Sequence, residues 1–259
     1  MTDLAGRTDP VPLFSDGSPL PSRVAPRYVR RFTLTERLMH WVHAAAFFVL
    51  LGTGLILYLP SLSAAVGRRT LIQDIHVYTA ISWLGALVLI ALLGNRRALL
   101  RTAREIDRWD DDDIRFLRGE LKTPQGRFNA GQKLNAIVSA AFAVLFFVSG
   151  MILWLGEQNT DIRLDGTLYL HDVLMYISVA IVAGHLFLAL LNPSTRHSTR
   201  GMVLGTVRQD WAAAHHRKWQ PPADFADRRR PPTTRERDTD DLRRSRGDLE
   251  PITPLSDRR

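Results

Sequence analysis

The stretch LYLHDVLMYISVAIVAGHLFLALLN, residues 168–192, decides the fold. Asp172 is its only formally charged residue, and most of its other side chains are aliphatic or aromatic. A helix needs about 20 such residues to cross the ~30 Å hydrocarbon core of a bilayer. The stretch therefore predicts a transmembrane helix. It also contains His171 and His185, and ionisable residues at membrane depth are commonly functional.

Three further apolar blocks precede this one, at residues 38–59, 74–95 and 134–156. Charged residues are concentrated between the blocks, whereas soluble proteins mix charged and apolar residues within each helical turn. The chain is predicted to be an all-α integral membrane protein with a four-transmembrane-helix bundle at residues 28–219. Residues 1–27 and 220–259 have almost no large apolar side chains and are predicted to be disordered.

The distribution of Lys and Arg predicts the orientation of the bundle. These residues gather before the first block, between the second and third, and after the fourth, whereas the other two loops contain only Arg68, Arg69 and Arg163. Cytoplasmic loops carry the excess of positive charge. We expect a multi-pass protein of the bacterial cytoplasmic (inner) membrane, with both termini, the tail and a helical loop at 96–118 in the cytoplasm.

Composition restricts the partners and cofactors. The net charge is +8, but the arginines flank apolar blocks, which predicts contact with membrane lipid and not with nucleic acid. The chain has no cysteine, so disulfides and cysteine-ligated iron–sulfur clusters within it are excluded.

Five histidines lie in or beside the predicted spans: His40, His43, His76, His171 and His185. His171 and His185 are 14 residues apart, which places them about 21 Å apart along a helix and within roughly 40° of one face. Because successive spans run in opposite directions, His76 shares the outer level with His171. Either His40 or His43 shares the cytoplasmic level with His185, and spacing favours His40 only weakly.

Two neutral imidazoles at each level suit the iron of haem b. Zinc or copper would need more ligands at each level, and a proton relay would need acids at the span centres. Any one of these histidines, taken alone, could equally be a buried or interfacial residue with a hydrogen-bond partner and no ligand role. Glycines near the histidines would leave space for a macrocycle, although close helix packing explains each of them equally well. They are Gly52, Gly54, Gly85, Gly150 and Gly184.

Short motifs surround these histidines: ERLMHW at 36–41, IH at 75–76, RFNAGQK at 127–133, LH at 170–171 and GH at 184–185. With the tail stretch from Arg200 to Trp219, they resemble the cytochrome b (gamma) subunit of respiratory, membrane-bound formate dehydrogenase over residues 28–220. Hydrogenase and thiosulfate reductase cytochromes share the histidine spacing alone. The NAGQK run and the tail stretch are more specific to the formate dehydrogenase type.

The resemblance implies the cofactor sites. His40, not His43, would join His185 on the iron of a cytoplasmic-side haem b, and His76 would join His171 on an outer-side haem b. A site for menaquinone or another quinone would lie beside the cytoplasmic-side haem, with Asn129, Gly131 and His185 as its residues. Asn129 is also suited to cap the third helix.

The resemblance also implies the function and the partners. The chain would be the electron-transfer and quinone-reducing subunit of a formate:quinone oxidoreductase in an anaerobic respiratory chain. Its partners would be an iron–sulfur (beta) subunit and, through it, a catalytic molybdenum or tungsten (alpha) subunit. The formate-oxidising site would lie outside this chain. The alternatives are a hydrogenase or thiosulfate reductase cytochrome b subunit, or a haem-free membrane transporter or sensor.

Overall fold

The computed structural model describes residues 27–221. In chain order its elements are β1 (Tyr28–Arg30), α1 (Leu34–Tyr58), α2 (Pro60–Val66), α3 (Arg69–Leu93), α4 (Arg96–Asp107), α5 (Asp111–Leu117), α6 (Ala130–Gln158), η1 (Thr160–Ile162), α7 (Thr167–Leu186), the π-helical turn η2 (Phe187–Leu191), η3 (Arg196–Ser198), α8 (Thr199–Leu204), β2 (Thr206–Arg208) and α9 (Gln209–His215). Apart from residues 27, 220 and 221, the predicted disordered segments 1–27 and 220–259 lie outside the described residues.

Four helices of the described chain are long and apolar enough to cross a membrane: α1, α3, α6, and α7 continued by η2. The predicted fold class is confirmed, but each helix begins before its apolar block. Polar capping turns explain this for two of them. Thr33 and Glu36 form a capping box before α1, and Asn129 and Gln132 form one before α6. Each box satisfies backbone N–H groups that would otherwise lack partners.

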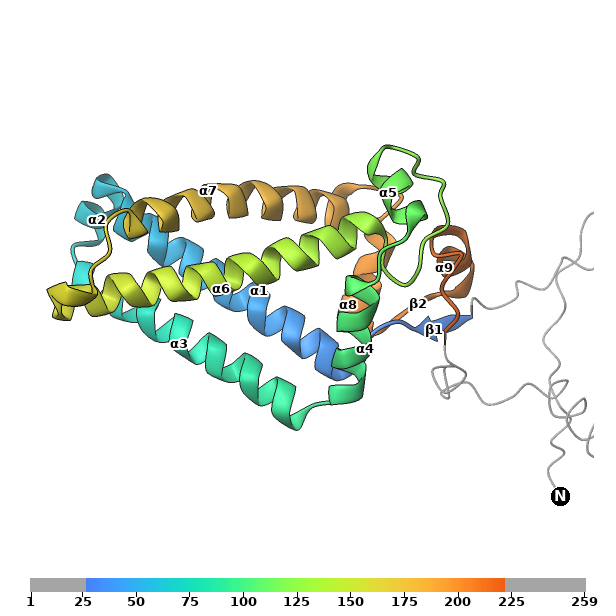
Figure 1. Cartoon of the computed structure of the whole chain (residues 1–259), viewed down its shortest axis with the longest axis horizontal. Helices are drawn as coiled ribbons and strands as arrows, with labels where there is room; N and C mark the ends of the chain where they lie inside the picture. The colour runs from blue at the N-terminus through green and yellow to red at the C-terminus, as the bar shows by residue number, and fades with distance from the viewer. Residues whose placement is uncertain (1–26, 222–259) are drawn as a thin grey trace, which may run out of the picture.

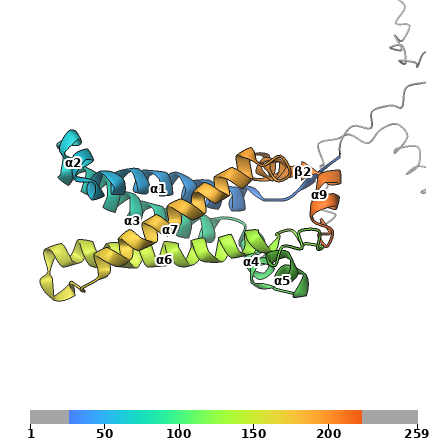
Figure 2. The ribbon, with the colours of Figure 1, turned by 90° about the horizontal axis from the view of Figure 1, so that it is seen from above.

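The bundle consists of two antiparallel hairpins. Helix α1 packs along α3, and α6 packs along α7 (Figure 1). Seen from above, α7 runs obliquely across the bundle, beginning beside α6 and ending near the start of α1 (Figure 2). Because of this oblique course, α7 contacts α6 at its start and α1 at its end.

The two ends of the bundle differ in structure. Strands β1 and β2 pair antiparallel, with Val29 opposite Val207. This ribbon lies with α4, α5, α8 and α9 beside the starts of α1 and α6 (Figure 1). We call this the ribbon end. At the opposite end, α2 connects α1 to α3, and η1 connects α6 to α7. We call this the far end.

Packing is dense at the ribbon end and sparse along the spans. Buried apolar residues at the ribbon end are Phe32, Ala98, Phe128, Ala130, Val207 and Ala212. On the spans, large apolar side chains stay exposed, including Phe48, Leu89, Leu93, Val144 and Leu191. Apolar surface of this extent around four long helices needs lipid to cover it. The chain is therefore an integral membrane protein.

Two irregularities interrupt the predicted elements. The helical loop expected at 96–118 divides into α4 and α5, because Asp110 and Asp113 form a capping box that starts a new helix. The fourth span ends in the wide turn η2, which begins two residues after His185. Such π-helical turns occur frequently at functional sites.

Candidate functional site

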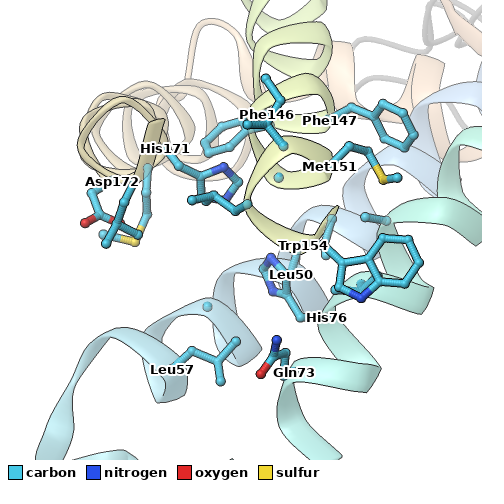
Figure 3. Close-up of a pocket in the computed structure, with 18 of the residues that line it drawn as sticks. Leu50, Leu57, Gln73, His76, Phe146, Phe147, Met151, Trp154, His171 and Asp172 are labelled. Atoms are coloured by element: carbon cyan, nitrogen blue, oxygen red, sulfur yellow. The ribbon is translucent and has the colours of Figure 1, made fainter. Parts of the chain in front are cut away.

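The far-end pair consists of His76 on α3 and His171 on α7, whose ring centres are 6.4 Å apart. Both rings point into one cavity, beside Phe146 and Met151 of α6 (Figure 3). The cavity has a volume of about 670 Å³, within the range of roughly 300–1,000 Å³ that small-molecule and cofactor sites occupy. Its lining is largely apolar, with polar groups such as Arg69, Gln73, Glu157 and Arg163.

The ribbon-end pair consists of His40 on α1 and His185 on α7, whose ring centres are 6.3 Å apart. His40 is half-buried, whereas His185 is exposed. Because His171 and His185 share α7, this helix contributes one ring to each pair. The structure thus brings together the histidines that were expected to share a level.

The spacing of both pairs fits one metal between two imidazoles. An imidazole nitrogen binds a transition metal at about 2 Å. Two rings on opposite sides of one ion therefore have centres about 6 Å apart. Within residues 27–221, no group of three or more His, Cys, Asp or Glu side chains is placed to hold a metal ion. Each pair therefore offers two protein ligands, the number that a haem iron needs in addition to its porphyrin nitrogens.

Two hydroxyl residues that sequence reasoning missed contact the far-end rings. Thr53 Oγ1 on α1 lies 2.9 Å from His76 Nδ1, and Ser149 Oγ on α6 lies 2.8 Å from His171 Nδ1. Both hydroxyl residues are buried. The available signal was a hydroxyl residue followed by glycine within each of two apolar helices, Thr53-Gly54 and Ser149-Gly150.

Two of the five glycines predicted to make room for a macrocycle lie against histidine rings. A Cβ atom on Gly54 or Gly150 would lie 3.5 or 3.4 Å from the Cε1 atom of the neighbouring far-end ring. Cε1 lies between the two ring nitrogens, and a Cβ on Gly54 would also lie 3.9 Å from Nδ1 of His76. A Cβ on Gly52, Gly85 or Gly184 would meet nothing within 4 Å. These three glycines are exposed, so the open space beside them does not distinguish room for a macrocycle from a lipid-facing surface.

His43 does not pair with His185. Its ring lies 5.6 Å from that of Trp83 on α3, and both residues line the far-end cavity. The turn of α1 that separates His40 from His43 therefore directs them to different neighbours. The structure places His40, and not His43, opposite His185.

A buried ionic network stabilises the ribbon end. The guanidinium of Arg127 donates to Glu36 at 2.8 Å, to Glu105 at 2.5 Å and to the hydroxyl of Thr102. Glu36 also accepts from the Thr102 hydroxyl and, at 2.6 Å, from the backbone N–H of Thr33. Glu36 and Arg127 are only 6% and 5% exposed. The charged groups of this network are paired with one another. The network thereby joins the starts of α1 and α6 to α4.

Two of the three residues predicted for a quinone site, Asn129 and Gly131, lie at the start of α6, and the third, His185, lies near the end of α7. Asn129 Oδ1 accepts from the backbone N–H of Gln132 at 2.9 Å, so the predicted helix cap is present. Among the described residues, the Asn129 side-chain NH₂ group has no hydrogen-bond partner. Gly131 is exposed, and a Cβ there would meet only Asn129 Oδ1, at 3.5 Å. An amide donor and open backbone therefore lie side by side at the ribbon end.

Two buried basic residues beside the ribbon have shifted pKa values. Burial, and next the charge of Arg31, lowers the pKa of His216 to about 3. Its Nδ1–H group donates to the Gly126 carbonyl at 2.6 Å. Burial, and next the charge of Arg127, lowers the pKa of Arg31 to about 9. At neutral pH, His216 is therefore uncharged beside charged arginine.

Comparisons with known proteins give a family and relatives for the chain. A family model described as prokaryotic cytochrome b561 matches residues 31–205. The formate dehydrogenase cytochrome b556(fdo) subunit of Escherichia coli K12 is 26% identical over 195 residues, 73% of this chain and 90% of the relative. The formate dehydrogenase cytochrome b556 subunit of Haemophilus influenzae is 26% identical over 201 residues, 74% and 82% of the two chains. The resemblance to formate dehydrogenase cytochrome b subunits is confirmed.

Proposed function

The chain belongs to the prokaryotic cytochrome b561 family, and from this membership we propose that it passes electrons from a formate dehydrogenase to a quinone. Family membership implies haem b binding. The relatives named as formate dehydrogenase cytochrome b556 subunits support the electron donor. The observation that carries the proposal is the presence of two histidine pairs, spaced by 6.3 and 6.4 Å, at two levels of one membrane bundle.

We assign one haem b to each pair: His40 and His185 at the ribbon end, and His76 and His171 at the far end. When bound, haem b supplies a one-electron carrier at each level. His171 and His185 are 14 residues apart on α7, so the two sites are separated by about 21 Å along the helix axis. The bundle thereby provides sites near both surfaces of the bilayer.

The ribbon end is proposed to face the cytoplasm of a bacterial inner membrane. The positive-inside rule supports this orientation, because the loops at the far end carry only Arg68, Arg69 and Arg163 as basic residues. Both chain termini would then be cytoplasmic, and the far-end pair would lie near the outer surface. A quinone reduced at the ribbon end would take its protons from the cytoplasm.

The quinone is proposed to bind at the ribbon end, beside His185, Asn129 and Gly131. The NH₂ group of Asn129, which has no partner within residues 27–221, can donate to a quinone carbonyl, and the exposed backbone of Gly131 allows a flat ring to approach. The exposed ring of His185 is the most open of the four ligand candidates. The substrate would be menaquinone or a related membrane quinone.

The proposed partners are an iron–sulfur subunit and, through it, a catalytic molybdenum or tungsten subunit. The test is to purify the full chain from its host membranes with its associated proteins. We expect a reduced-minus-oxidised haem b spectrum, two midpoint potentials, and copurifying formate dehydrogenase subunits. Adding formate should reduce both haems, and adding a menaquinone analogue should reoxidise them.

Each part of the proposal has its own contrary outcome. A colourless protein would indicate a transporter or sensor and remove the cytochrome proposal. Copurification with hydrogenase or thiosulfate reductase subunits, with no reduction by formate, would replace the proposed donor. Asn129→Ala tests the quinone site. It should slow quinone-dependent reoxidation and leave reduction by formate unchanged, and an unchanged reoxidation rate would reject Asn129 as a quinone residue.

A further inference from the structure

Each far-end histidine is contacted on Nδ1 by a buried hydroxyl from the preceding span. For His76 the hydroxyl is that of Thr53, and for His171 it is that of Ser149. The hydroxyl residues are 9% and 2% exposed. Burying a polar group without a hydrogen-bond partner costs free energy.

The direction of these hydrogen bonds follows from the other contacts of the hydroxyls. Thr53 Oγ1 donates to the Val49 carbonyl at 2.8 Å, and Ser149 Oγ donates to the Leu145 carbonyl at 2.7 Å. A hydroxyl has one hydrogen to donate. The arrangement that satisfies the hydroxyl, the carbonyl and the ring together has each oxygen accept from the histidine, which places the imidazole proton on Nδ1. The lone pair of each ring is left on Nε2, the nitrogen free to bind a metal.

The same arrangement arises twice, from two different hairpins. Residues 53–57 read Thr-Gly-Leu-Ile-Leu, and residues 149–153 read Ser-Gly-Met-Ile-Leu. The contacted histidine follows the hydroxyl by 23 residues in the first hairpin and by 22 in the second. In both, the next residue is a glycine whose missing Cβ leaves the Cε1 edge of the ring uncovered.

A hydroxyl bonded to a carbonyl three or four residues earlier is common within helices and has no functional meaning alone. Two features distinguish this case. Both hydroxyls also contact a ring nitrogen, and both contacted rings belong to one facing pair. At the ribbon end the situation differs, because neither His40 nor His185 has a hydrogen-bonded side chain among the described residues.

We propose that Thr53 and Ser149 are positioning residues for the far-end haem. They hold His76 and His171 in one tautomer and orientation, and their acceptor oxygens strengthen electron donation from Nε2 to iron. Stronger donation favours the ferric state, so the two hydroxyls lower the reduction potential of this haem. The inference rests on the proposed function, because it requires haem at the far-end pair. Partners of this kind on the second ring nitrogen are common for metal-binding histidines.

The test is a redox titration of the purified full complex, followed by haem absorbance, with Ser149→Ala and Thr53→Val. Each substitution should raise the far-end midpoint potential and leave the ribbon-end midpoint unchanged. Removing such a partner changes metal binding about tenfold or more. A tenfold change confined to the ferric state corresponds to about 59 mV for a one-electron couple. The double variant should shift the potential further than either single variant.

Conservative and matched variants complete the test. Ser149→Thr and Thr53→Ser keep the hydroxyl and should restore the wild-type potential. Thr79→Val and Ser82→Ala remove hydroxyls of α3 that line a separate shallow groove with Val42 and Ala46, and these should leave both potentials unchanged. If Ser149→Ala prevents far-end haem binding, recovery of that haem in Ser149→Thr supports the same role.

The outcomes separate this inference from the proposed function. Two haems in the wild type, with a far-end potential that neither Ser149→Ala nor Thr53→Val shifts, would overturn the positioning role and leave the proposed function intact. An equal shift in Thr79→Val would also overturn it, since the effect would then not depend on the ring contacts. A wild-type protein without a haem that depends on His76 and His171 would overturn the proposed function itself.

Discussion

The two histidine pairs have nearly the same ring spacing, 6.4 and 6.3 Å, in very different surroundings. At the far end, each ring contacts a hydroxyl of a neighbouring span. At the ribbon end, a buried ionic network holds the start of α1, and its member Glu36 lies four residues before His40. The comparison shows that rings at the same spacing can have different surroundings: buried hydroxyls contact the rings directly at the far end, whereas ion pairs connect the helix starts at the ribbon end.

The largest expected effect comes from removing one ring. His171→Ala and His76→Ala should each remove the same haem, halving the haem per polypeptide, while His40→Ala should remove the other one. Haem content by the pyridine haemochrome assay and the surviving midpoint potential measure this. His215→Ala, an exposed residue of α9, is the control and should retain both haems. Loss of different midpoints in His76→Ala and His171→Ala would refute the far-end pairing.

Filling the space beside a far-end ring should remove the far-end haem without affecting the ribbon-end haem. In Gly150→Leu, a large side chain starts from a Cβ that would lie 3.4 Å from Cε1 of His171. We expect most of the far-end haem to be lost and the ribbon-end haem to be kept. Gly150→Ala, an ordinary van der Waals contact, should keep both haems. Equal loss of both haems in Gly150→Leu would mean that the whole bundle had been disturbed.

Breaking the ionic network should lower the thermal stability of the ribbon end. Arg127→Ala leaves the buried Glu36 carboxylate without its guanidinium, and breaking a buried pair costs about 3–5 kcal/mol. We expect a lower midpoint of thermal unfolding, followed by circular dichroism in detergent, and earlier loss of the ribbon-end haem on heating. Arg115→Ala breaks an exposed pair with Glu120 and should change the midpoint little. Similar midpoints for both variants would show that the network adds no stability.

The smallest expected effect is a pH dependence at the ribbon end. The pKa of His216 is about 3 in the folded chain against 6.5 for a free group, so the unfolded chain binds the extra proton between these values. Stability should therefore fall as pH decreases from 6.5 towards 3, by at most about 1.4 kcal/mol per pH unit. Thermal unfolding at pH 7.5 and 5.5 measures this. The neutral variant His216→Gln should show a weaker pH dependence, and an equally steep one would exclude His216 as its source.

The amino-acid sequence alone determined the fold class, because the length and polarity of a span are local properties. A run of about 20 apolar residues must cross a bilayer as a helix, since no other open structure satisfies its backbone there. The 14-residue spacing of His171 and His185 likewise determined that one helix offers rings at two levels, because helical rise and period are constant. Helices α1 and α6 begin before their apolar blocks, because their capping residues Thr33 and Asn129 are polar and the apolar pattern does not include them.

The tertiary structure decided the side-chain contacts that helix spacing left open. Spacing left His40 and His43 open, because residues three apart lie near the same helix face, and the positions of α3 and α7 separate them. The hydroxyls of Thr53 and Ser149 reach rings more than 20 residues away in sequence, and the network around Arg127 joins segments about 90 residues apart. Contacts of this kind depend on how the helices pack, which the period of a single helix does not contain.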